Sequence, residues 1–106
     1  MFNIGDYEFK SKKACVEFIK DMLKDYEPDA LFCKIDEAFL LALLKQHPEY
    51  EDKVRPGILG IIKKKIPHYS SFGFVIIYQD GSEVDFSYRK CLNKMTHKEA
   101  SHDNSD

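Results

Sequence analysis

The apolar positions in the first half of the chain recur with the spacing of amphipathic helices. Between residues 14 and 26 they fall three or four apart, and Ser11 precedes them as a predicted N-cap. A second helix is predicted for residues 36–47, with Asp36 as its N-cap and a proline directly after it. Residues 2–9 are expected to form a strand or a small hairpin. The N-terminal half therefore predicts extended chain followed by two helices.

The second half changes to the β-branched and aromatic pattern that is typical of strands. An isoleucine-rich segment covers residues 58–66, and two further strands are predicted for residues 72–79 and 82–89. Asp80-Gly81 has the composition of a two-residue turn between the last two strands. These segments predict a three-stranded antiparallel unit.

The predicted two-residue turn decides which side chains share a face of this hairpin. It places Val75 opposite Phe86, on a face that is expected to pack on the helices. Phe72 and Phe74 then lie on the other face, with Arg89 opposite Phe72. One face is therefore predicted to be apolar, and the other to combine exposed aromatic rings with charge.

Together these elements predict an α+β fold: an N-terminal strand, two helices and an antiparallel three-stranded unit, with both helices on one sheet face. With 106 residues, of which 43% are hydrophobic, the chain is large enough for one core. Residues 1–95 are expected to form a single domain, and residues 96–106, which lack apolar periodicity, a disordered polar tail. Every apolar run is too short to span a bilayer, so no membrane partner is expected.

The cysteine pattern argues against a disulfide framework and against a metal site. The three cysteines are an odd number and form no CxxC pair, which favours free thiols in a reducing cytoplasm. The first ten residues include acids and lack an apolar segment, so they predict neither a signal peptide nor a transit peptide. No metal and no other cofactor is predicted.

A nuclease is the less favoured of the functional alternatives. Asp80 and Asp85 lie on one predicted hairpin, where paired carboxylates would suit a metal that cleaves phosphodiesters. A third ligand at a suitable spacing is missing from the sequence. No catalytic residue is therefore assigned.

The net charge of −2 conceals an asymmetry between the two halves of the chain. Residues 1–50 carry −3, residues 51–100 carry +3, and no acid occurs between Lys53 and Gln79. Exposed aromatic rings beside cations are typical of single-stranded RNA binding, in which bases stack on rings and phosphates meet the charges. An ordinary solvated surface, with the rings packed inside the protein, is the structural alternative. The candidate RNA-binding residues are Lys53, Arg55, Lys63, Lys64, Lys65, His68, Phe72, Phe74, Arg89 and Lys90.

The motifs of the second half are similar to those of a known family. Asp80-Gly81-Ser82 is followed by Asp85-Phe86-Ser87-Tyr88 and Lys90-Cys91, and upstream Phe39-Leu40 precedes His47-Pro48. With these motifs the chain resembles the defective-chloroplasts-and-leaves (DeCL) domain family, as a small stand-alone member. The resemblance covers nearly the whole of the predicted folded part.

The resemblance implies a link to ribosomal RNA maturation and to the largest subunits of plant-specific RNA polymerases, where the same domain is appended. It supplies no catalytic residues. The chain departs from the plant pattern, because Phe72 and Tyr78 stand where flanking arginines are expected, which weakens phosphate binding on that face. The favoured function is a non-catalytic nucleic-acid-binding domain for RNA. The alternative is a protein-interaction module that binds a polymerase, a ribosome or another macromolecular machine.

Overall fold

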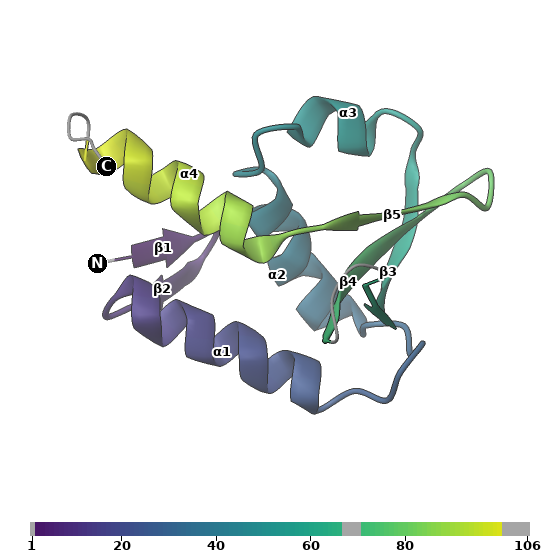
Figure 1. Cartoon of the computed structure of the whole chain (residues 1–106), viewed down its shortest axis with the longest axis horizontal. Helices are drawn as coiled ribbons and strands as arrows, with labels where there is room; N and C mark the ends of the chain where they lie inside the picture. Colours follow the sequence, from purple (N-terminus) through teal and green to yellow (C-terminus); the bar gives the residue numbers. More distant parts are fainter. Residues whose placement is uncertain (1, 67–70, 101–106) are drawn as a thin grey trace.

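The computed structural model describes residues 2–66 and 71–100. In this part the chain folds as an α+β domain, in which an N-terminal hairpin and helices pack beside a three-stranded antiparallel sheet (Figure 1). The elements in chain order are β1 (Phe2–Ile4), β2 (Tyr7–Phe9), α1 (Lys12–Lys24), α2 (Lys34–Leu44), α3 (Tyr50–Val54), β3 (Ile58–Lys65), β4 (Phe72–Tyr78), β5 (Glu83–Phe86) and α4 (Tyr88–Ala100). The predicted fold class is confirmed.

The start of α1 follows the sequence prediction, whereas the start of α2 does not. Ser11 caps α1, because its Oγ accepts a hydrogen bond from the backbone N–H of Ala14 at 3.1 Å. The N-cap of α2 is Cys33, which makes no capping hydrogen bond through its side chain. The prediction of Asp36 as the N-cap is wrong. Its carboxylate lies in the first turn of α2 and accepts a hydrogen bond from the hydroxyl of Tyr26 at 2.7 Å.

The register of the β4–β5 hairpin differs from the prediction by one residue. Phe74 pairs with Phe86, and the backbone N–H of Tyr78 donates a hydrogen bond to the carbonyl of Ser82. The loop that this bond closes therefore contains three residues, Gln79, Asp80 and Gly81, the last with φ +88°. The carboxylate of Asp80 accepts hydrogen bonds from both the backbone N–H and the hydroxyl of Ser82 and so stabilises this longer loop. A shift of one residue moves every side chain of one strand to the other face relative to its partner.

The changed register turns the aromatic face of β4 inward. Phe74, Ile76 and Tyr78 are buried, together with Phe86 of β5 and Ile61 of β3. The prediction that Phe74 lies on an exposed face is therefore wrong, and the structural alternative of packed rings applies to this residue. Three loop residues in place of two are the physical reason.

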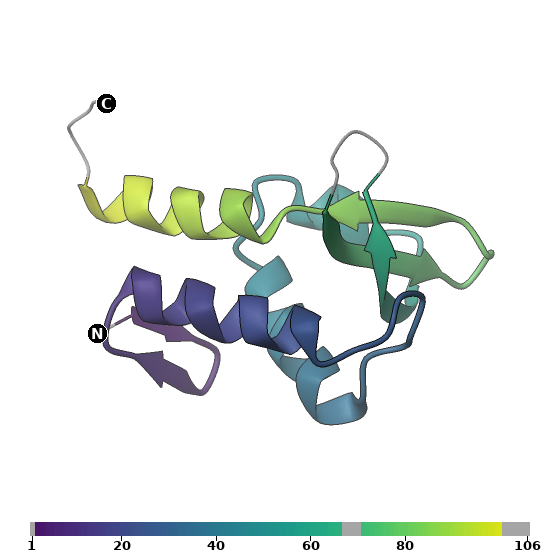
Figure 2. The ribbon, with the colours of Figure 1, turned by 60° about the horizontal axis from the view of Figure 1, so that its bottom comes forward.

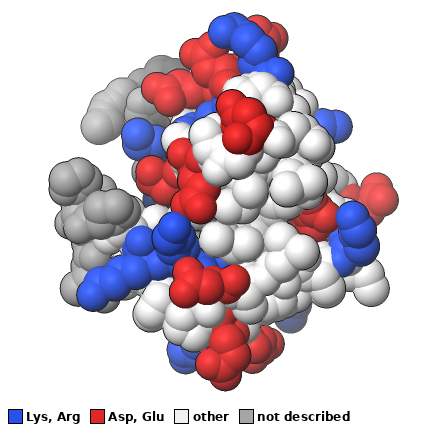
Figure 3. Space-filling model, turned by 90° about the vertical axis from the view of Figure 1, so that its right-hand side faces the viewer, with Lys and Arg blue, Asp and Glu red and all other residues white. Residues whose placement is uncertain are grey.

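The outer face of the sheet carries Ile62, Val75 and Ile77, with an ion pair of 2.8 Å between Lys64 and Glu83 beside them. The segment before α2 adds Leu31, which forms a bridge with Ile62 and is 63% exposed. On the sheet side of the molecule, Figure 3 shows a broad area without charged side chains, bordered by charges of both signs.

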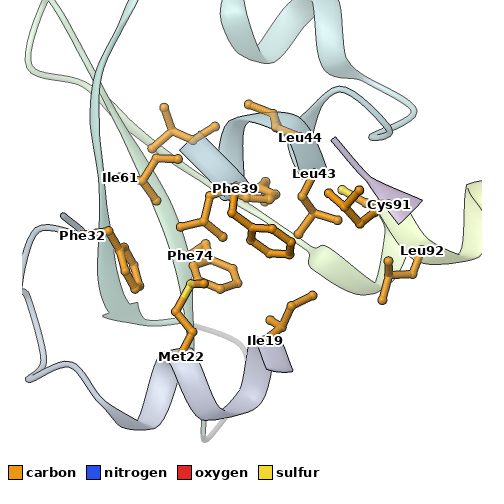
Figure 4. Close-up of a cluster of buried hydrophobic side chains, with 14 of the residues drawn as sticks. Ile19, Met22, Phe32, Phe39, Leu43, Leu44, Ile61, Phe74, Cys91 and Leu92 are labelled. Carbon is orange, nitrogen blue, oxygen red and sulfur yellow. The ribbon is translucent and has the colours of Figure 1, made fainter. Parts of the chain in front are cut away.

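The inner face of the sheet shares one hydrophobic core with helices α1, α2 and α4. Ile19 from α1, Phe39 from α2 and Leu92 from α4 belong to the same buried cluster as Phe74 (Figure 4). Helix α4 was not predicted, because the sequence around it was assigned to the last strand and a polar tail. The predicted domain boundary between residues 95 and 96 falls inside α4, and residues 101–106 lie outside the described part.

Helices α1 and α4 run side by side, as Figure 2 shows. The ammonium group of Lys12 joins them by donating a hydrogen bond of 2.8 Å to the side-chain carbonyl of Asn93. The C-terminal end of α1 and the N-terminal end of α4 both approach the same end of the sheet. This arrangement frames the candidate site.

Candidate nucleic-acid interface

A cleft of about 570 Å³ opens between the second half of α1, the paired ends of β3 and β4, and the junction of β5 with α4. Its aromatic lining comes from Phe72, Phe74, Phe86 and Tyr88. Phe72 is 40% exposed, whereas Phe74 is fully buried beneath it in the core. The cleft therefore offers an accessible aromatic ring at the end of the sheet.

Four exposed cations from two helices surround this ring. Lys20 and Lys24 lie four residues apart in α1, so they share one face of the helix. Arg89 and Lys90 stand in the first turn of α4. None of these four side chains forms an ion pair with another residue of the described part of the chain. Their charges remain available to an anion.

The start of α4 adds to the positive potential of the cleft. Its first turn contains no acid, and the hydroxyl of Ser87 accepts a hydrogen bond from the backbone N–H of Lys90 at 3.2 Å. The N-terminal end of a helix carries a partial positive charge and attracts anions such as phosphate. Asp85 is the one acidic residue among the described lining residues. Its backbone carbonyl accepts a hydrogen bond of 3.0 Å from the ammonium group of Lys53.

Lys63 supports the exposed ring from inside the protein. Its ammonium nitrogen lies 5.0 Å from the ring centroid of Phe72 and donates a hydrogen bond of 2.6 Å to the backbone carbonyl of Tyr26. The residue is only 8% exposed. Its positive charge is therefore engaged by contacts within the protein.

The other cations that were predicted to bind RNA do not gather at the cleft. Arg55 pairs with Asp52 at 3.0 Å, and Lys64 pairs with Glu83 on the outer face of the sheet. Lys65 is exposed at the end of β3 and does not belong to the described cleft lining, and His68 lies outside the described residues. Of the ten predicted residues, the cleft brings together Phe72, Phe74, Arg89 and Lys90.

The sequence analysis missed Lys20 and Lys24. In the sequence they occupy the polar face of an amphipathic helix, which normally faces solvent. Their spacing of four residues shows that they share a helix face, but their proximity to the sheet end follows only from the packing of α1.

Two of the three cysteines are kept in the protonated form by burial. Burial raises the pKa of the Cys15 thiol to about 11 and that of Cys91 to about 12, so both remain protonated at neutral pH. Asp80 is engaged by Ser82, which lowers the pKa of its carboxyl group. In residues 2–66 and 71–100 no group of three histidine, cysteine or acidic side chains could hold a metal.

The helices of the described residues are also unsuited to a bilayer. None of them combines the length and the apolar composition that crossing it requires.

Fold and site together define a small α+β domain with an aromatic cleft between cationic helix ends. The chain belongs to the family described as "Protein of unknown function (DUF3223)", whose model matches residues 20–92. This match and the plant relatives named DCL confirm the resemblance to the DeCL domain.

Relatives of known sequence place this domain in larger proteins. Over 86 residues, 81% of this chain, it is 33% identical to DNA-directed RNA polymerase IV subunit 1 of Arabidopsis thaliana, of which the match covers 6%. Over 71 residues, 66% of this chain, it is 37% identical to Protein DCL homolog, chloroplastic, of the same plant, of which the match covers 32%. The chain thus spans less than half the length of these plant relatives.

A solved structure of similar size shows the same fold. The solution NMR structure of an uncharacterized protein from Rhodospirillum rubrum is 37% identical in sequence and superposes with a TM-score of 0.77. The match covers 85% of this chain and 86% of that chain.

Proposed function

We propose that this domain is a non-catalytic nucleic-acid-binding module and that its cleft binds RNA. The observation that carries the proposal is that the exposed ring of Phe72 shares its cleft with Lys20, Lys24, Arg89 and Lys90, which form no ion pair within the described part of the chain. Stacking rings beside cations are the combination by which proteins hold single-stranded nucleic acid.

The relatives support a setting in RNA-related machinery. One of them is the first subunit of an RNA polymerase, and the matching segment is a small part of that large protein. The family resemblance adds a link to ribosomal RNA maturation. A domain that matches a segment of a polymerase subunit and also a segment of the DCL homolog fits a binding role that is transferable between proteins.

A protein-interaction module is the second candidate function. The observation in its favour is the area without charged side chains on the sheet side of the molecule (Figure 3). Leu31 is 63% exposed and Leu59 60% exposed. Such surfaces occur where another macromolecule binds.

The experiment that separates the two candidates is a titration of labelled single-stranded RNA, followed by fluorescence anisotropy at several salt concentrations. Phosphate contacts release counterions, so the affinity should fall steeply between 50 and 200 mM salt. Lys24→Gln and Arg89→Gln should each weaken binding and flatten the salt dependence.

Lys13→Gln is the matched control, because Lys13 is exposed on the same helix as Lys24 but outside the described cleft lining. It should leave the RNA affinity nearly unchanged. A wild-type protein that shows no binding up to about 100 μM in low salt, which is weaker than ordinary non-specific binding, would leave the protein-interaction function as the better account.

A further inference from the structure

We infer that the cleft accepts a single unpaired nucleotide within a strand. Its base stacks on the side of the Phe72 ring that faces the cleft, and the cations of α1 and α4 hold its two flanking phosphates. The inference rests on the proposed function and specifies the ligand of the same site. It also assigns Lys63 a positioning role behind the ring.

The aromatic ring of Phe72 has one accessible face. The ammonium group of Lys63 stands 5.0 Å from the ring centroid, and it is held there by its hydrogen bond to the carbonyl of Tyr26. Because this cation is buried, it covers the ring from the protein side. The 40% exposure of Phe72 therefore belongs to the side that faces the cleft.

The other described rings of the cleft do not provide a second ring face on which a base could stack. Phe74 and Phe86 are both buried in the core, with ring centroids 5.6 Å apart, and the Phe74 centroid lies 5.4 Å from that of Phe32. Tyr88 carries the guanidinium group of Arg89 above its ring at 5.2 Å. One accessible ring face accommodates one base.

The cations of the cleft lie on two helices. Lys20 and Lys24 approach the cleft from α1, and Arg89 and Lys90 approach it from the first turn of α4. A nucleotide inside a strand has one phosphate on each side, so two separate cationic groups match its two phosphates. The volume of about 570 Å³ lies in the range of sites that hold one small ligand.

A base in a duplex cannot reach Phe72, because it remains stacked between its neighbours and paired with the opposite strand. Extruding it costs the stacking and pairing energy, and this cost is smallest for a base that is already unpaired. The site should therefore distinguish a single strand or a bulged nucleotide from a continuous duplex.

The experiment compares a single-stranded RNA nonamer with the blunt-ended duplex that it forms with its complementary strand, by anisotropy at three salt concentrations. The wild-type protein should bind the single strand more tightly. Phe72→Leu should weaken single-strand binding by about 5- to 150-fold, which corresponds to the loss of one stacked base, and should leave the salt slope unchanged. Phe72→Tyr retains the ring and should retain the affinity.

Lys63→Met tests the positioning role, because it preserves the length of the side chain and removes the charge behind the ring. It should weaken single-strand binding at an unchanged salt slope. Lys24→Gln should instead flatten the slope by about 0.7, the value for one phosphate contact on a single strand. Circular dichroism confirms that each variant is folded.

A second readout makes the test independent of affinity. A single 2-aminopurine in the RNA loses fluorescence when it stacks on an aromatic ring, so saturating wild-type protein should quench it and saturating Phe72→Leu should not. Equal binding of single strand and duplex, or full quenching by Phe72→Leu, would overturn the inference while leaving RNA binding intact. A flattened slope for Lys63→Met would overturn its positioning role. Absence of binding to both RNAs would overturn the proposed function itself.

Discussion

The two faces of the three-stranded sheet use the same run of lysines in different ways. On the inner face Lys63 is buried, and its charge is bound to a backbone carbonyl and to an aromatic ring. On the outer face its neighbour Lys64 pairs with Glu83. Strand alternation sends consecutive residues to opposite faces, so a basic cluster in the sequence is divided in the fold. The basic rim of the cleft comes instead from two helices that are distant in the chain.

The largest effect is expected from removing an aromatic ring from the depth of the inner face. Phe74 is fully buried, so Phe74→Ala should lower the free energy of unfolding by about 3–5 kcal/mol. Phe72→Ala, at the open end of the same face, should lower it far less. Chemical denaturation of both variants measures the difference, and equal losses would contradict the distinction between a core ring and a cleft ring.

The next effect compares the two lysines directly. Lys63→Met removes a charged donor from a buried carbonyl and should lower the free energy of unfolding by about 1.5–3 kcal/mol. Lys64→Met removes an exposed ion pair and should leave stability unchanged within error. Thermal denaturation of the two variants at equal ionic strength tests this order, which a more damaging Lys64→Met would reverse.

A smaller effect is expected at the loop between β4 and β5, whose length sets the register of the hairpin. Gly81 has φ +88°, a conformation that β-branched residues avoid, and no neighbouring atom lies within 4 Å of the Cβ that a substitution would add. Gly81→Val should therefore cost about 1 kcal/mol through backbone strain alone. Gly81→Asn, which tolerates this conformation better, is the control. An unchanged denaturation midpoint for Gly81→Val would contradict the three-residue loop.

The smallest effect is a dependence of the stability on pH. His47 is buried, and burial, followed by the nearby charge of Lys53, lowers its pKa below the ordinary value of 6.5. As the pH falls, His47 in the unfolded chain therefore takes up a proton at a higher pH than His47 in the folded protein. The contribution of His47 is fully present above pH 6.5 and decreases as the pH falls toward the folded-state pKa.

The comparison of unfolding curves at pH 7.5 and at successive steps below 6.5 measures this contribution. His47→Gln should show a weaker pH dependence than the wild type over the same range. An identical slope in the two proteins would show that His47 does not contribute to it.

Helix α1 and strand β4 could be predicted because their periodicity is local. The α1 helix follows from apolar residues at helical spacing after Ser11, and β4 from a run of aromatic and β-branched residues. The register could not be predicted from Asp80-Gly81 alone, since Gln79 joins the loop and Asp80 bonds to Ser82. One loop residue was enough to reverse the expected exposure of Phe74.

The candidate site was predictable only in part, for a related reason. Arg89 and Lys90 were identified beside Phe72, because the sequence brings them near the end of the hairpin. Lys20 and Lys24 became part of the site only through the packing of α1 beside the sheet. A site that depends on distant elements leaves no continuous pattern in the sequence.

The short bridge between Leu31 and Ile62 has a consequence for how the sheet can be extended. Hydrogen bonds from Asp29 and Phe32 to β3 occupy backbone groups on that edge of the sheet. On the opposite edge β5 has only four residues, and the ammonium group of Lys53 occupies the outward carbonyl of Asp85. Covered and shortened edges protect a sheet from adding strands of other chains. Backbone pairing with a strand of another chain is therefore disfavoured at both edges of this sheet.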